Sequence, residues 1–327
     1  MQCLRISLLT TGALLTSIRL FGGNPANVLS RECVRMNTLL SEQIAGGRLD
    51  DAKRSVDETL SQVPIEPVCA GLLSNNLAAA LQIAGRLDEA RVFAERAIAQ
   101  FQKSLAADDS AYLRPLQIIA TVDLLQGMTG KAREVFRRMQ AIRATDPSDR
   151  VLLLWISGSL LEREGRKQEA ESALIAARAA LSDAGRQNSA DAASICGQLA
   201  CLYLHERRYR EAAAAVNTAL STLSLAGDVR PLDRIKLLDT RAAVCAHENR
   251  WPDAESDLAE AVSLAREQPK IDSVELRPLV KDYAYVLRKL HRKEARSIEA
   301  WASALQSTNT ASGQVVDLTE LAAGRNE

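Results

Sequence analysis

Apolar and small residues recur along this chain at spacings of three, four and seven, which is the periodicity of amphipathic α-helices, and no sustained alternation typical of β-strands occurs. One short motif repeats around an alanine, followed in most copies by an apolar or small residue four positions later and by another alanine seven positions later. These anchor alanines are Ala52, Ala90, Ala132, Ala170, Ala212, Ala254 and Ala295, and they are 38, 42, 38, 42, 42 and 41 residues apart. Self-similarity at such a period predicts an array of repeated structural units.

A polar segment before each anchor predicts a tight turn between two helices. Gly47, Gly85, Gly127 and Gly165 stand five residues before the first four anchors, and Asn249 takes that place in the sixth unit. Gly and Asn accept the left-handed conformation that ends a helix. An acidic residue directly before six of the seven anchors would face the positive end of the next helix.

Small residues also mark where the two helices of a pair should approach most closely, twelve positions before the anchor. They are Ala78, Ala120, Gly158, Ala200 and Ala242. We therefore predict an all-α chain of seven helix pairs over residues 29–307, at about 33–62, 70–105, 112–145, 150–184, 192–225, 233–267 and 275–307. Residues 308–327 contain no anchor and are predicted to be a polar tail or a short capping helix.

These features resemble the tetratricopeptide repeat, in which a large apolar and a small residue precede an aromatic residue and an Ala-x-x-x-Phe pattern. Leu199-Ala200, Tyr203, Ala212 and Val216 match that order in the fifth unit. The longer period, of about 42 residues, is similar to that of kinesin light chains and many bacterial repeat proteins. Arg241 and Ser157 depart from the pattern, because they replace the large apolar residue. The resemblance implies a right-handed superhelical solenoid of antiparallel helix pairs, with the first helix of each pair lining a concave groove.

First-helix positions fifteen, fourteen, eleven and eight before each anchor should face that groove, by helical periodicity and by the resemblance. They are mostly polar or small: Asn37, Asn75, Asn76, Gln82, Gln117, Thr121, Trp155, Ser159, Glu162, Gln198, Asp239 and Thr240. Amide side chains can donate to and accept from a peptide backbone together, which suits an extended ligand. Arg114 and Lys236, one turn earlier, could clamp carboxylates. Trp155 is either an interface anchor or a residue buried between units.

The sequence contains no complete catalytic or metal-binding signature. The segment around Gly127 and Lys131 has too few residues between its glycines for a phosphate loop and lacks the following Ser or Thr. His205 and His247 each precede a glutamate, but neither has the second histidine of a zinc-protease motif. We therefore expect no enzyme activity, no cofactor and no metal site. Lys plus Arg equals Asp plus Glu at 41 each, so no basic excess favours nucleic acid.

Residues 1–28 predict a signal peptide, because Arg5 precedes a mildly apolar stretch of thirteen residues, Ile6–Ile18. The alternative is a disordered or helical leader of a cytoplasmic protein. Thirteen residues are too few to span a bilayer, and no other segment is apolar for long enough, so we expect no integral membrane span. The first interpretation predicts a secreted or periplasmic protein.

Cys33 and Cys69 fall at the starts of two adjacent equivalent helices, where a disulfide is feasible; separate buried thiols are the alternative. Taken together, the sequence predicts a non-catalytic scaffold that binds a peptide or protein segment in the concave groove. The alternative function is a regulatory or sensor solenoid that changes its superhelical shape when it binds a small ligand or peptide.

Overall fold

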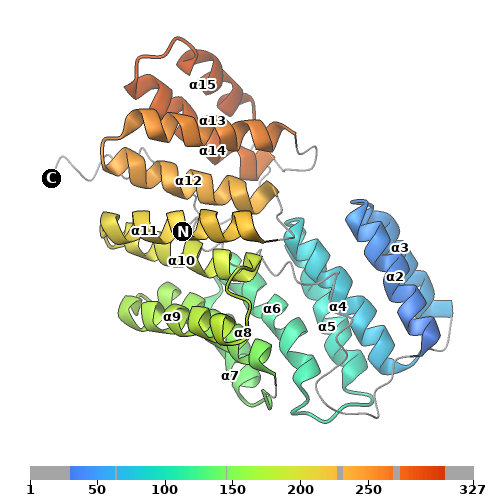
Figure 1. The fold of residues 1–327 in the computed structure, drawn as a ribbon. Coiled ribbons are helices and arrows are strands. Elements are labelled where there is room, and N and C mark those ends of the chain that lie inside the picture. The colour runs from blue at the N-terminus through green and yellow to red at the C-terminus, as the bar shows by residue number, and fades with distance from the viewer. Residues whose placement is uncertain (1–29, 63–64, 145, 227–230, 268–272, 306–327) are drawn as a thin grey trace. The chain divides into compact units, whose positions relative to one another are not determined.

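The protein was analysed as a computed structural model, which describes residues 30–62, 65–144, 146–226, 231–267 and 273–305. Within these residues the chain forms fourteen α-helices and one short 3₁₀ turn, and no strand (Figure 1). The predicted leader, 1–28, and the predicted tail, 308–327, lie outside the described residues.

The helices follow one another as seven antiparallel pairs, each joined by a short turn. In chain order the pairs are α2 (Arg31–Ala45) with α3 (Leu49–Gln62), α4 (Pro67–Ile83) with α5 (Leu87–Phe101), α6 (Leu113–Leu125) with α7 (Thr129–Gln140), α8 (Pro147–Arg163) with α9 (Lys167–Asp183), α10 (Ala190–His205) with α11 (Tyr209–Leu225), α12 (Pro231–His247) with α13 (Trp251–Arg266), and α14 (Ser273–Lys289) with α15 (Ala295–Ala304).

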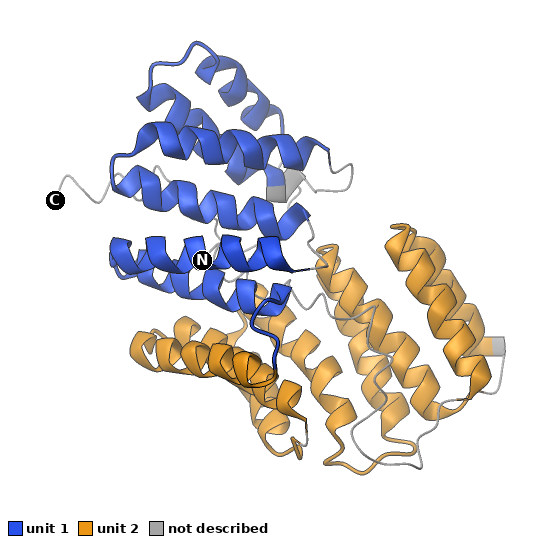
Figure 2. Cartoon of the chain, in the orientation of Figure 1, with its two compact units in different colours: residues 1–10, 185–327 blue, residues 11–184 orange. Residues whose placement is uncertain are grey.

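The described helices divide into two compact units (Figure 2). The N-terminal unit holds α2–α9 and the C-terminal unit holds α10–α15. Within each unit the second helix of one pair packs against the first helix of the next, and successive first helices also touch, as in α4 with α6 and α10 with α12. Each unit is thus an all-α solenoid of stacked helix pairs, which is the fold class that the sequence predicts.

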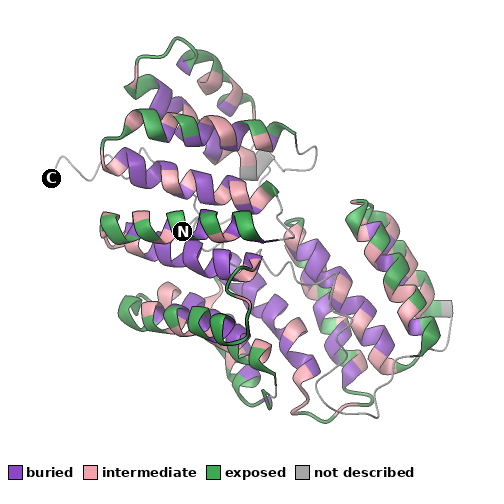
Figure 3. Ribbon diagram, viewed as in Figure 1, coloured by how far each residue is buried: buried purple, intermediate pink, exposed green. Residues whose placement is uncertain are grey.

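First helices are the more deeply buried of the two kinds (Figure 3). Twelve of the 13 residues of α6 and 13 of the 16 residues of α10 are buried, whereas their partners α7 and α11 bury three of 12 and five of 17. A first helix contacts its own partner and the helices of neighbouring pairs, so little of its surface remains for water. Polar residues on first helices are therefore enclosed more often than periodicity alone suggests.

The predicted close approach within each pair is confirmed. Ala78, Ala120, Ala200 and Ala242 have no exposed surface. At Gly158, the fifth member of the set, an added Cβ would stand 2.8 Å from the Leu174 side chain of the partner helix. Small residues at this position let the two helix backbones come together.

The turns also match the prediction. Gly85 has a φ of +76°, and the backbone N–H groups of Gly85 and Arg86 donate to Gln82 and Leu81, which satisfies the last carbonyls of α4. Asn249 takes the same conformation with a φ of 60°, as do Arg207 at 60°, a residue type without this preference, and His291 at 54°. The corners of the C-terminal unit therefore carry side chains where those of the N-terminal unit carry none.

The acidic residue after the turn has a second role beyond facing the helix end. Glu89 accepts hydrogen bonds from Arg86 at 2.6 and 2.9 Å and from Lys53 of the preceding pair at 2.6 Å. These bonds, first of all those from Arg86, lower the pKa of Glu89 to about 2. The same clip between an arginine and an acid three residues later recurs at the starts of α9, α11 and α13.

Candidate functional site

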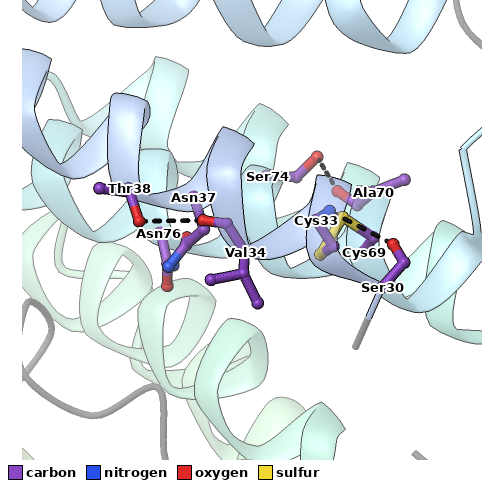
Figure 4. Close-up of a disulfide and its surroundings, with 9 residues drawn as sticks. All are labelled: Ser30, Cys33, Val34, Asn37, Thr38, Cys69, Ala70, Ser74 and Asn76. Carbon is purple, nitrogen blue, oxygen red and sulfur yellow. Dashed lines mark hydrogen bonds between the residues drawn. A yellow bond between two sulfur atoms is a disulfide. The ribbon is translucent and has the colours of Figure 1, made fainter. Parts of the chain in front are cut away.

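The inner helices of the N-terminal unit bring two predicted groove residues directly together. Asn76 on α4 donates from Nδ2 to Oδ1 of Asn37 on α2 at 2.7 Å (Figure 4). Both side chains are half-buried. The pair joins equivalent helices of successive repeats, so these amides hold two repeats together.

Three more predicted residues form a buried polar group on the next two first helices. Asn75 on α4 and Gln117 on α6 occupy the same repeat position, and Thr121 lies one turn after Gln117. Their exposed fractions are 6%, 3% and 0%. Neither Oδ1 of Asn75 nor Oγ1 of Thr121 has a hydrogen-bond partner. Buried polar atoms normally form hydrogen bonds. The Asn75 Oδ1 therefore lacks a donor, and the Thr121 hydroxyl lacks an acceptor.

The other predicted residues of this unit are distributed unevenly. Gln82, Trp155 and Ser159 are buried, and Ser159 donates its hydroxyl to the Trp155 carbonyl at 3.1 Å. For Trp155, the structure thus shows the buried arrangement. Arg114 and Glu162 are half-buried.

In the C-terminal unit the predicted residues lie on α10 and α12. Gln198 and Thr240 are buried, and Thr240 donates to the Lys236 carbonyl at 3.0 Å. Lys236 and Asp239 are half-buried on α12. Burial raises the pKa of the Asp239 carboxyl, because desolvation disfavours its charged form.

A disulfide joins Cys33 of α2 to Cys69 of α4, with the two Cα atoms 5.8 Å apart (Figure 4). Both residues are about 1% exposed, and Ser30 caps α2 beside them by accepting from the Cys33 N–H at 3.3 Å. The bond links the first pair to the second at the same end of the two helices.

Two clefts between successive second helices were not anticipated from the sequence. In the N-terminal unit, α5, α6 and α7 border an open cleft of about 280 Å³, here called the α5–α7 cleft. In the C-terminal unit, α11, α12 and α13 enclose one of about 230 Å³, the α11–α13 cleft. Counted from the anchor alanines, the two clefts use the same repeat positions.

Each cleft contains an ion pair whose carboxylate is buried, but in a different arrangement. In the α5–α7 cleft, Arg91 of the second pair contacts Asp123 of the third, and the Asp123 side chain is 1% exposed. In the α11–α13 cleft, Arg241 binds Asp257 within one pair through hydrogen bonds of 2.8 and 2.5 Å. Arg241 departs from the repeat pattern, because it replaces a large apolar residue. Asp257 compensates for this change by accepting both hydrogen bonds of the guanidinium. Cys245 lines this cleft, and burial first of all raises the pKa of its thiol to about 11.

Two kinds of feature are absent from the described residues: a helix that could span a membrane and a group of metal-ligating side chains. None of the described helices combines the length and the apolar character needed to cross a bilayer. In the same part of the chain, no three His, Cys, Asp or Glu side chains are grouped to hold a metal ion. His247 instead stacks on the Tyr209 ring, with centroids 4.7 Å apart.

Comparison with known proteins agrees with the stacked pairs and their turns. A family model described as the tetratricopeptide repeat matches residues 69–144, which span α4 to α7. Residues 69–144 are tetratricopeptide-type repeats, and the other described pairs share their fold. No match was found among curated protein sequences.

Solved structures share the fold of this repeat protein at low sequence identity. BtubC (BKLC) from P. vanneervenii is 17% identical, with 72% of this chain and 96% of that chain covered and a TM-score of 0.50. The APC/C hetero-tetramer Cut9–Hcn1 is 12% identical, with 93% and 50% covered and a TM-score of 0.62. NprR in complex with its cognate peptide NprX is 11% identical, with 87% and 82% covered and a TM-score of 0.54. At these identities the likeness concerns the fold alone.

Proposed function

We propose that this repeat protein is a non-catalytic scaffold that binds an extended peptide or protein segment along the first helices of its N-terminal unit. The observation that carries the proposal is the row of polar side chains on α2, α4 and α6, half-buried at Asn37 and Asn76 and buried at Asn75 and Thr121, whose Oδ1 and Oγ1 atoms have no hydrogen-bond partner. A peptide backbone offers both an N–H donor for the amide oxygen and a carbonyl acceptor for the hydroxyl.

Neighbouring polar groups extend this surface. Gln117 on α6 takes the repeat position that Asn75 has on α4, and the bonded amides Asn37 and Asn76 continue this surface to α2. A row of amide and hydroxyl groups without a strong net charge suits main-chain recognition more than recognition of a charged side chain. The fold relative NprR, which is seen with its cognate peptide, is consistent with such a role.

The test begins with a peptide-display selection on the purified full-length chain, followed by fluorescence anisotropy with the synthetic peptides that emerge. We expect Asn75→Ala and Thr121→Val each to weaken binding of a selected peptide about fivefold to tenfold, since one hydrogen bond contributes roughly 1 kcal/mol. Thr218→Val is the matched control, because the Thr218 hydroxyl is exposed on α11 and bonded within its own helix. Circular dichroism checks that each variant remains folded.

The proposal fails if no peptide is selected, or if the affinity of the selected peptides is the same in Asn75→Ala, Thr121→Val and Thr218→Val. Loss of binding in Thr218→Val as well would show that the selected peptide does not bind specifically along the first helices.

We also propose that the protein works in an oxidising compartment, secreted or periplasmic. The bond between Cys33 and Cys69 supports this, since cytosolic thiols are kept reduced. Mass spectrometry of protein from its native host tests the proposal: the expected chain begins after the predicted leader and lacks free thiols at Cys33 and Cys69. A full-length chain with both thiols reduced would refute it.

A further inference from the structure

We propose that the α5–α7 cleft binds a free apolar α-amino acid, with its ammonium group on Asp123, its carboxylate on Lys131 and its side chain on the apolar floor. This site is separate from the peptide surface of the first helices. The proposal rests on a cavity, an unsatisfied carboxylate oxygen and the distribution of charges around them.

The cavity has the size and floor for a small apolar group. Its volume is about 280 Å³, near the lower end of the range for ligand pockets. Ile98, Ile119 and Val135 line it and are 7%, 5% and 9% exposed. These three side chains come from α5, α6 and α7 in turn, so every wall contributes an apolar surface.

Asp123 supplies the acceptor for a cationic group. Its Oδ1 contacts the Arg91 guanidinium, but its Oδ2 is buried and has no hydrogen-bond partner. A buried carboxylate oxygen without a donor is costly, and an incoming ammonium group would satisfy it with a charge-assisted bond. Arg91 is already committed to Oδ1 and therefore does not compete for Oδ2.

Lys131 supplies the cation for a carboxylate. It is exposed at the cleft, and no ion pair within 4.0 Å joins Lys131 to another described residue. Because α6 and α7 run antiparallel through a short turn, Asp123 near the end of α6 lies at the level of Lys131 near the start of α7. An α-amino acid carries its ammonium and carboxylate on one carbon, so both must bind at the same end of the cleft.

Arg138 provides a control within the same cleft. It lines the cavity on the same face of α7, seven residues after Lys131, which is about 10 Å along the helix axis. A free amino acid bound at the Asp123 end does not reach Arg138. A longer dipolar ligand, such as a peptide, would use both cations.

The test measures L-leucine binding to the full-length chain by saturation-transfer NMR and calorimetry at millimolar concentrations, because a ligand this small binds weakly. We expect leucine to bind, and expect leucinamide, which lacks the carboxylate, and N-acetyl-leucine, which lacks the ammonium, to bind roughly tenfold more weakly or not at all. Lys131→Gln should weaken leucine binding by a similar factor. Arg138→Gln and Lys167→Gln, an exposed site on α9, should leave it unchanged.

Three results would overturn the proposal. They are the absence of leucine binding in the folded wild-type chain, equal binding of leucine and its two blocked derivatives, and an equal loss of binding in Lys131→Gln and Arg138→Gln. The last result would assign the cleft to a longer charged partner. All these substitutions are at exposed positions, so the fold should be retained, which circular dichroism verifies.

Discussion

Removal of the Cys33–Cys69 disulfide should loosen the first helix pair while the rest of the protein stays folded. The bond closes a loop between residues 36 positions apart, and a loop of this length lowers the entropy of the unfolded chain by the equivalent of about 3–4 kcal/mol at 25 °C. The buried apolar residues of the first pair are few: Cys33, Leu40, Ala52 and Val56. A terminal repeat with so small a core depends strongly on its attachment to the next repeat.

The perturbation is the double substitution of Cys33 and Cys69 by serine, and the assay is hydrogen exchange followed by mass spectrometry. A change of about 3–4 kcal/mol corresponds to an increase of two to three powers of ten in the opening of α2 and α3. Exchange in α8 and α9, which lie at the far end of the same unit in the sequence, should change little.

Two controls make the result specific. A reducing agent should bring the α2 and α3 exchange of the wild-type chain to that of the double variant and should not change it further in the variant. Cys245→Ala removes a free thiol from the C-terminal unit and should leave exchange in α2 and α3 as it is. Unchanged exchange of α2 and α3 in the double variant would refute the reasoning, since it would mean that packing alone holds the first pair.

Three further predictions concern single residues. Gly71→Ala should destabilise the N-terminal unit by about 1–3 kcal/mol in urea unfolding, because the new Cβ would stand 2.3 Å from the buried Phe101 ring, whereas Gly130→Ala, with nothing within 4 Å, should be neutral or stabilising. Arg207→Gly should raise the stability of the C-terminal unit by about 1 kcal/mol in the same assay, because a side chain at a φ of 60° is strained; a decrease would show that the arginine side chain outweighs the strain. The pKa of Glu89 is lowered in the folded state to about 2, so the stabilising effect of this carboxylate is complete above its ordinary pKa of 4.5 and is lost as the pH falls toward 2. As the pH is lowered through this range, the urea midpoint of wild type should therefore decrease more steeply than that of Glu89→Gln. Equal slopes for the two proteins would contradict a lowered pKa at Glu89.

Repeat periodicity was enough to predict the helix pairs, their turns and the small residues at the helix crossings. The left-handed conformation of Gly85 and the burial of Ala78 both follow from local preferences that a sequence displays. The same conformation at Arg207 could be inferred only from its alignment with the glycines, since arginine does not favour it, whereas histidine is a residue type enriched in this conformation and His291 lies four residues before its anchor.

The candidate sites were predicted less completely, because periodicity assigns a residue to a helix face but does not identify what it contacts. It assigned Asn37 and Asn76 to the same face of successive first helices, yet their mutual hydrogen bond depends on the spacing between repeats. The α5–α7 cleft depends on how three helices meet. The one available signal was the pair of cations, Lys131 and Arg138, seven residues apart on one helix.

The ion pairs of the two clefts, Arg241 with Asp257 and Arg91 with Asp123, would respond differently if a repeat were duplicated or deleted. Arg241 and Asp257 belong to the same hairpin, so that hairpin could be copied or moved to another position without separating them. Asp123 and Arg91 belong to different hairpins. Deletion of the second hairpin would leave the aspartate of the third without its counterion, so this junction should tolerate recombination poorly. Moving the sixth hairpin would keep its own ion pair and would break the exposed contact of Glu255 with Arg292 of the seventh.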